Sequence, residues 1–181
     1  MKNIRKWARK KDFLWLLLYP VYQTIGALRH EGSHALAAMA EGARIREFEF
    51  WPSIRNGRFF WGYVRVTGRT TWFFSAAPFF CDLITFFVAL SIILIAKPQR
   101  RWLWLNVIII GMLSPIMNSA WAYFRGLTIL NDVGNLLRIL DSTAVHLYFA
   151  LTLLLYICGI LYCLHRRASD DMQESEPAAG V

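Results

Sequence analysis

The chain has 181 residues, of which 56% are hydrophobic and 15% aromatic, and its mean hydropathy is +0.37. This composition is too apolar for an ordinary soluble domain and predicts a membrane protein. The formal net charge of +8 does not indicate a nucleic-acid partner, because the Lys and Arg residues lie mostly in short runs beside apolar segments, without a basic helix or an RNA-binding signature.

Four apolar segments follow a basic N-terminal tail at residues 1–12. A helix needs about 20 mostly apolar residues to cross a bilayer. The segments that meet this length are 13–40, 72–96, 102–123 and 143–164. Pro20 is expected to kink the first helix, and Gly42 to end it. The sequence therefore predicts an all-α, multi-pass membrane protein with about four transmembrane helices.

A β-hairpin is predicted between the first and second helices, at about residues 45–67. Glu47 to Phe50 alternate between charged and aromatic residues, Asn56-Gly57 is a strong tight-turn pair, and Tyr63 to Thr67 favours a strand. Because bare strand edges are not tolerated in lipid, this hairpin must be covered by protein or lie at the membrane interface.

Basic clusters predict the orientation of the chain. The N-terminal tail, the linker at residues 97–101 and the pair Arg166-Arg167 favour the cytoplasmic side, which places both termini in the cytoplasm of a plasma or inner membrane. Six arginines in the hairpin region favour the opposite orientation: Arg44, Arg46, Arg55, Arg58, Arg65 and Arg69. The membrane domain spans residues 13–167, and residues 168–181 form an acidic tail that is expected to be disordered.

Ionisable residues inside the first predicted helix are the main functional candidates. They form a His-Glu-x-x-His motif, His30, Glu31 and His34. Residues four apart share one face of a helix, so the two imidazoles can bind one metal ion. Glu31 lies about 100° further round the helix, where it can take a proton from a metal-bound water. Polar groups are costly in an apolar helix, which argues against a chance match.

The motif and its neighbours resemble a known family. The stretch from His30 to Ala38, followed by Gly42-Ala43-Arg44, is similar to the first motif of the site-2 protease family of intramembrane zinc metallopeptidases. In that family such a helix commonly leads into a β-hairpin. Ala76-Ala77-Pro78 is similar to a small-residue and proline motif that the family often carries. The resemblance implies one Zn²⁺ ion and a membrane-protein or membrane-associated peptide as substrate.

A zinc hydrolase needs a third protein ligand, which the family takes from an Asp in a later motif. Asp132 is the residue that the resemblance favours, although the family's Asn-Pro-x-Pro stretch is absent before it. Topology supports Asp132 independently, because the first and third predicted spans run in the same direction and end on the same side. Asp82 and His146 are alternative third ligands. Asp82 is also a candidate second-shell partner, and Asn118 a candidate substrate contact.

The predicted function is hydrolysis of peptide bonds within or next to the membrane, with Glu31 activating the zinc-bound water. The first alternative is a non-catalytic membrane scaffold or regulatory binding protein with the same architecture. The second is a metal transport or sensor protein that uses the same histidines. The complete His-Glu-x-x-His motif favours the enzyme, because a non-catalytic protein has no chemical need for Glu31.

Overall fold

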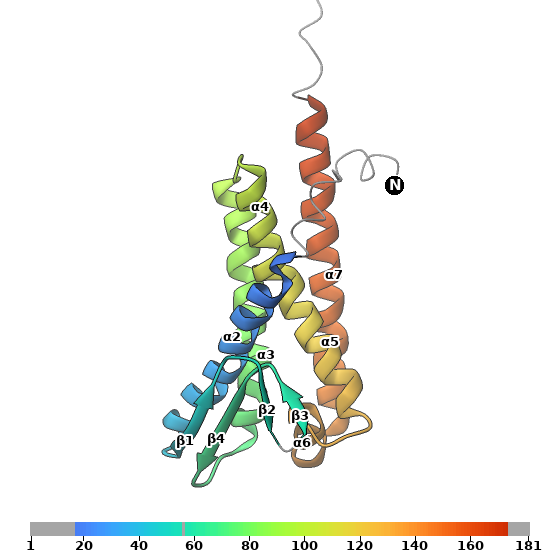
Figure 1. The fold of residues 1–181 in the computed structure, drawn as a ribbon. Coiled ribbons are helices and arrows are strands. Elements are labelled where there is room, and N and C mark those ends of the chain that lie inside the picture. Colours follow the sequence, from blue (N-terminus) through green and yellow to red (C-terminus); the bar gives the residue numbers. More distant parts are fainter. Residues whose placement is uncertain (1–16, 56, 174–181) are drawn as a thin grey trace, which may run out of the picture.

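The structure is a computed structural model that describes residues 17–55 and 57–173 (Figure 1). The predicted basic tail at 1–12, the first residues of the first predicted span and the end of the acidic tail, from 174, lie outside the described residues. Asn56 of the predicted turn lies outside them as well. The expectations for these segments stay predictions.

Helix α2 (Tyr19–Ala40) carries the His-Glu-x-x-His motif. Pro20 lies in its first turn, where the missing N–H costs no helical hydrogen bond, so the expected kink at this residue is wrong. The prediction that Gly42 ends the helix is confirmed. Its φ of 78° is a left-handed conformation that glycine adopts readily, and the chain leaves the helix there.

Three helical segments in the described part of the chain are long and apolar enough to cross a membrane. One of them ends in a π-helical turn, and another is interrupted by one. They comprise α3 (Trp72–Ser91) with η2 (Ile92–Ala96); α4 (Arg101–Ile108), η3 (Ile109–Leu113) and α5 (Ser114–Gly126); and α7 (Ser142–Gln173). Helix α2, which belongs to the first expected span, is not among them, because its polar motif residues lower its hydropathy.

The predicted hairpin is present as two antiparallel strand pairs. Strand β1 (Arg44–Glu49) pairs with β4 (Tyr63–Thr67), and β2 (Ser53–Arg55) pairs with β3 (Arg58–Phe60). The register of β1 shifts between Ile45 and Glu47, which is a β-bulge. Figure 1 shows this sheet at one end of the helices, in front of the C-terminal part of α2, and both β1 and β4 contact that helix.

Helix α6 (Asp132–Ile139) lies at the same end as the sheet (Figure 1). It packs against α3 and α5 and precedes α7. Helix α7 continues to Gln173, so the start of the acidic tail, residues 168–173, is helical rather than disordered. Helix α7 thus extends past the predicted domain boundary at 167.

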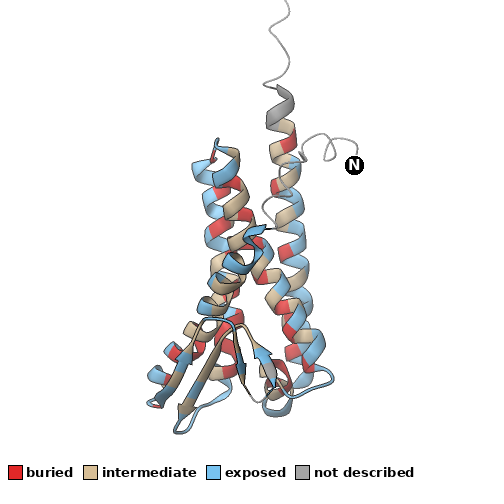
Figure 2. Cartoon of the chain, in the orientation of Figure 1, coloured by how far each residue is buried: buried red, intermediate tan, exposed pale blue. Residues whose placement is uncertain are grey.

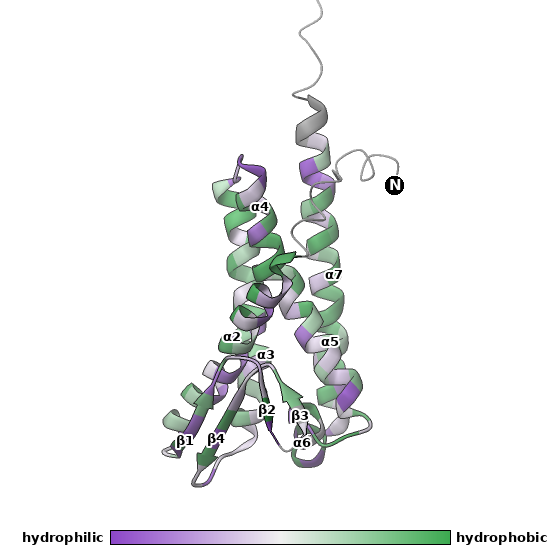
Figure 3. Ribbon diagram, in the orientation of Figure 1, coloured by the Kyte–Doolittle hydropathy of each residue, from purple (hydrophilic) through white to green (hydrophobic). Residues whose placement is uncertain are grey.

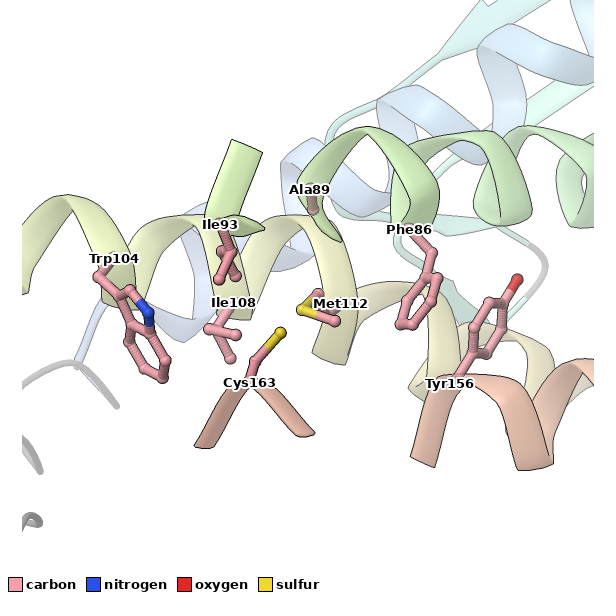
Figure 4. Close-up of a cluster of buried hydrophobic side chains, with 8 residues drawn as sticks. All are labelled: Phe86, Ala89, Ile93, Trp104, Ile108, Met112, Tyr156 and Cys163. Atoms are coloured by element: carbon pink, nitrogen blue, oxygen red, sulfur yellow. The ribbon is translucent and has the colours of Figure 1, made fainter. Parts of the chain in front are cut away.

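The helices bury a row of apolar side chains between α3, α4 and α7 (Figure 4). Phe86 packs against Tyr156 with ring centroids 4.7 Å apart, and both side chains are fully buried. Large apolar residues also cover the outside of the bundle, including Ile95 and Leu154. Figures 2 and 3 show that exposed surface on α3 and α7 is largely hydrophobic. An apolar outer surface of this kind suits a lipid environment.

Candidate metal centre

The structure brings together three residues that could hold a metal ion: His30, His34 and Asp132. Their candidate ligand atoms all lie within 4.8 Å of one another. Oδ2 of Asp132 is 3.4 Å from Nε2 of His30 and 3.3 Å from Nε2 of His34. The two histidine rings meet at 80° with their centroids 4.9 Å apart. Asp132 rather than Asp82 or His146 therefore completes the group.

The shape of the group suits a tetrahedral ion. Two ligand atoms that each lie about 2.0–2.1 Å from a tetrahedral metal are roughly 3.3–3.4 Å from each other, which agrees with both histidine–aspartate separations. His34 is buried, but the side chains of His30 and Asp132 keep 18% and 24% of their surface exposed. The exposed side leaves room for a fourth ligand that is not a protein group.

The carboxyl of Asp132 is held in its ionised form. Burial raises its pKa, but the facing imidazoles of His30 and His34 outweigh burial and leave the pKa well below the ordinary range. Two imidazoles facing one carboxylate are a donor set that zinc commonly takes.

Helix α6 positions Asp132 at its first residue. The side chain of Asn131 caps this helix by accepting a hydrogen bond of 2.9 Å from the backbone N–H of Gly134. The Asn131 amide also donates to the carbonyl of Ala122 at 2.8 Å, which ties the start of α6 to α5. Val133 is fully buried and anchors the next residue in the core. This local structure aims Asp132 at α2.

His34 is oriented by a backbone group of α3. Its Nδ1 lies 2.8 Å from the carbonyl oxygen of Phe74. Because a carbonyl oxygen only accepts, Nδ1 carries the ring proton in this contact. Nε2, the nitrogen that faces Asp132, is then free to bind a metal.

Glu31 lies beside the group and against the sheet. Its carboxylate accepts a hydrogen bond from the backbone N–H of Val64 in β4. A Cβ at Gly62 would come within 2.7 Å of Cγ of Glu31 and 3.2 Å of Cβ of Ala27, so only glycine fits at this bend. The sheet therefore fixes the position of the glutamate that was predicted to act as a base.

Asp82 does not take part in the group but lies behind it in a buried ion pair. Its Oδ1 accepts from Nε of Arg29 at 2.8 Å, and the side chain is almost fully buried. Arg29 also donates to the carbonyl of Ile110 in η3 and to Oγ of Ser114. Asp82 lies outside the group that could hold a metal ion, because the packing of α2 on α3 pairs it with Arg29.

Asn118 connects this ion pair to the candidate metal centre. Its Nδ2 donates to Oδ2 of Asp82 at 2.7 Å and lies 3.2 Å from Nδ1 of His30. Ser119 lies 3.4 Å from the same oxygen of Asp82. Asp82 does not touch the candidate ligands directly, but it is joined to His30 through the side chain of Asn118. His146 is elsewhere: its Nδ1 lies 3.0 Å from the hydroxyl of Tyr123.

The sequence did not predict three features of the site. They are the contact of the Phe74 carbonyl with His34, the place of Gly62 against Glu31, and the pairing of Arg29 with Asp82. A backbone carbonyl carries no residue-specific signal, and the place of Gly62 depends on the fold of the sheet over α2. Arg29 had a signal, because it lies in a span-length segment, Asp82 is the one charged residue of the segment at 72–96, and each would be costly alone.

Comparison of the chain with protein-family models, with curated proteins and with solved structures finds no match.

Proposed function

We propose that this chain is a membrane zinc endopeptidase of the site-2 protease type, which cleaves peptide bonds within or next to the bilayer. The observation that carries the proposal is the convergence of His30, His34 and Asp132, with Glu31 adjacent, at one end of a bundle with three span-length apolar helices. Histidine, histidine and a carboxylate beside a glutamate are the parts of a zinc hydrolase.

The metal-binding residues and Glu31 have separate roles in the proposed reaction. His30, His34 and Asp132 would hold one zinc ion, which when bound supplies Lewis-acid polarisation of the scissile carbonyl and makes a water more acidic. Glu31 would take the proton from the attacking water and pass it to the leaving amine. The accessible sides of His30 and Asp132 give the peptide a path to the centre.

The substrate must be extended when it is cut, because a helix locks its carbonyls in internal hydrogen bonds. The sheet beside α2 offers a partner for an extended chain, since β1 has one neighbour, β4, and an outer edge that the ladder leaves open. A substrate strand that adds to this edge would have its backbone ordered before cleavage.

One observation favours a second candidate, a non-catalytic scaffold or regulatory binding protein. The Glu31 carboxylate accepts a hydrogen bond from the Val64 N–H, and Gly62 lies against the Glu31 side chain. Catalysis therefore requires that the carboxylate reach a water molecule from this position. In a scaffold the same contact would only join the sheet to α2. The two candidates differ in whether Glu31 matters for turnover.

The test uses the full chain purified in detergent or reconstituted in vesicles. Metal analysis should find about one zinc per chain, and His34→Ala should lose it. Glu31→Gln should keep the zinc but lose cleavage of a panel of single-span membrane segments. Wild-type protein without zinc would refute the metal centre, whereas zinc-loaded protein that cleaves no segment in the panel would favour the scaffold.

A further inference from the structure

The proline inside α3 leaves a backbone carbonyl without its helical partner. Pro78 is a fully buried residue within Trp72–Ser91. An α-helix pairs the carbonyl of residue 74 with the N–H of residue 78, but proline has no N–H. A proline in a helix interior is strongly unfavourable relative to alanine, and an unsatisfied carbonyl in an apolar environment is also costly. The carbonyl of residue 74 therefore needs another hydrogen-bond donor.

The partner of the freed carbonyl is the candidate metal ligand His34. The Phe74 oxygen lies 2.8 Å from Nδ1 of His34, and the histidine is 4% exposed, so water cannot easily replace it. The carbonyl that has no helical hydrogen bond because of Pro78 is thus the one that accepts a hydrogen bond from His34. The same contact leaves Nε2 facing Asp132 at 3.3 Å, in the tautomer that metal binding requires.

Small residues make this contact reachable. A histidine ring on one helix can bond the backbone of another only when the helix axes come close, and small side chains permit that approach. Helices α2 and α3 pack directly on each other. The buried residues around the contact are Ser33, Ala35, Ala37 and Ala38 on α2 and Ser75, Ala76 and Ala77 on α3.

We propose that Pro78 is a positioning residue for the metal centre: by withholding an N–H, it keeps the Phe74 carbonyl available to hold the His34 ring and its tautomer. The inference rests on the proposed metal centre. It explains why the Ala76-Ala77-Pro78 stretch lies one turn beyond the histidine contact. Alanine at position 78 would supply an N–H that competes with His34 for the Phe74 oxygen.

The test compares Pro78→Ala with wild type in two measurements on full-length protein. The first is thermal unfolding of the metal-free protein, which should stay the same or rise, because alanine restores a helical hydrogen bond. The second is zinc affinity by competition with a chromophoric chelator, which should fall about 10- to 100-fold, as expected when an outer-shell partner is lost. The visible spectrum of the Co²⁺-substituted protein should change with it.

Pro115→Ala is the matched control, since Pro115 is also buried and helical, in α5, but is outside the metal group. It should leave zinc affinity and the Co²⁺ spectrum at wild-type values. Unchanged zinc affinity in Pro78→Ala would overturn the inference. So would an equal loss in both variants, or a lower unfolding temperature of metal-free Pro78→Ala, which would assign the proline to packing. Wild-type protein that binds no zinc would instead overturn the proposed function, and this inference with it.

Discussion

Nε2 of His34 lies 3.3 Å from Oδ2 of Asp132, although 98 residues separate the two in the sequence. The separation exceeds the about 2.7–2.9 Å of a strong charge-assisted hydrogen bond, and it matches the spacing of two ligands on a tetrahedral ion. The sheet and two span-length helical segments lie between the residues in the chain. Their convergence is therefore a property of the whole fold.

Replacing Asp132 should abolish tight metal binding. Asp132→Asn keeps the shape of the side chain but removes its charge, so zinc affinity should fall by more than the roughly 100-fold that loss of an outer-shell partner costs. Chelator competition measures the change. Asp141→Asn is the control, because Asp141 is exposed and caps α7 through the N–H of Thr143. Equal affinities for Asp132→Asn and wild type would exclude Asp132 as a ligand.

Enlarging Gly62 should impair catalysis without removing the metal. A Cβ at this position would come within 2.7 Å of Cγ of Glu31 and 3.3 Å of the Glu49 carbonyl, so Gly62→Val must displace the glutamate or the sheet. Displacing a catalytic group by about 1 Å can cost on the order of 100-fold in rate.

The measurement for Gly62→Val is cleavage rate alongside zinc content, and Gly32→Ala is its comparison. An added Cβ at Gly32 has no atom within 4 Å, although it lies next to Glu31 on α2, so this variant should fold and load zinc normally. Wild-type cleavage by Gly62→Val would show that the bend over Glu31 has no influence on the reaction.

Asn118 should influence zinc binding through His30. Its Nδ2 can only donate, so Nδ1 of His30 accepts in this contact, and a neutral ring carries its proton on Nε2, the nitrogen that faces Asp132. Asn118→Leu removes this donor and lets the ring take the other tautomer, so zinc affinity should rise. Asn106→Leu is a matched control: Asn106 accepts a hydrogen bond from the Tyr22 hydroxyl, so it also joins α2 to the α4 segment, but outside the metal group. An affinity loss of similar size in the two variants would assign both residues to helix packing alone.

The sheet should loosen in acid because of two glutamates. Hydrogen bonds from Arg55 lower the pKa of Glu47 and of Glu49. Groups with depressed folded pKa values stabilise the fold above their unfolded pKa, about 4.3 for glutamate, and this stability is lost as pH falls through the folded pKa. Carboxyl NMR should give both midpoints below that of a free glutamate, and Arg55→Gln should raise both.

Arg65→Gln provides the comparison for this titration. Arg65 contacts Glu47 alone of the two glutamates, at 3.3 Å, so this variant should raise the Glu47 midpoint and leave that of Glu49 nearly unchanged. If Arg55→Gln moved neither midpoint, the ion pairs of the sheet would not be formed in solution.

The close approach of α3 and η3 should depend on Gly111. A Cβ there would lie 2.3 Å from Cβ of Ala89, so Gly111→Ala forces the helices apart and should lower stability by about 1–3 kcal/mol. Thermal unfolding in detergent measures the loss. The double variant Ala89→Gly with Gly111→Ala removes the clash and should recover part of the stability. No recovery would mean that the glycine matters for another reason.

Local features of the site and the fold could be predicted from sequence because their causes are local. Helical geometry alone places His30 and His34 on one face, and hydropathy alone marks the long apolar helices that include Trp72–Ala96. Turn chemistry marks the hairpin near Gly57, whose φ of 73° suits glycine. The same local arguments misjudged Pro20, because the position of a proline within a helix depends on where the helix begins.

Sequence by itself determined the pair of histidines, the adjacent glutamate and the apolar helices, since each depends on residues a few positions apart. The sequence favoured Asp132 as the acid that joins the histidines, and the tertiary structure decided between it and the alternatives. Asp82 and Asp132 were both chemically suitable, but helix packing gives Asp82 to Arg29 and leaves Asp132 facing the imidazoles. The tertiary structure also decided that the Phe74 carbonyl holds His34, because a contact between a side chain and a backbone carbonyl far apart in sequence has no signal in either segment.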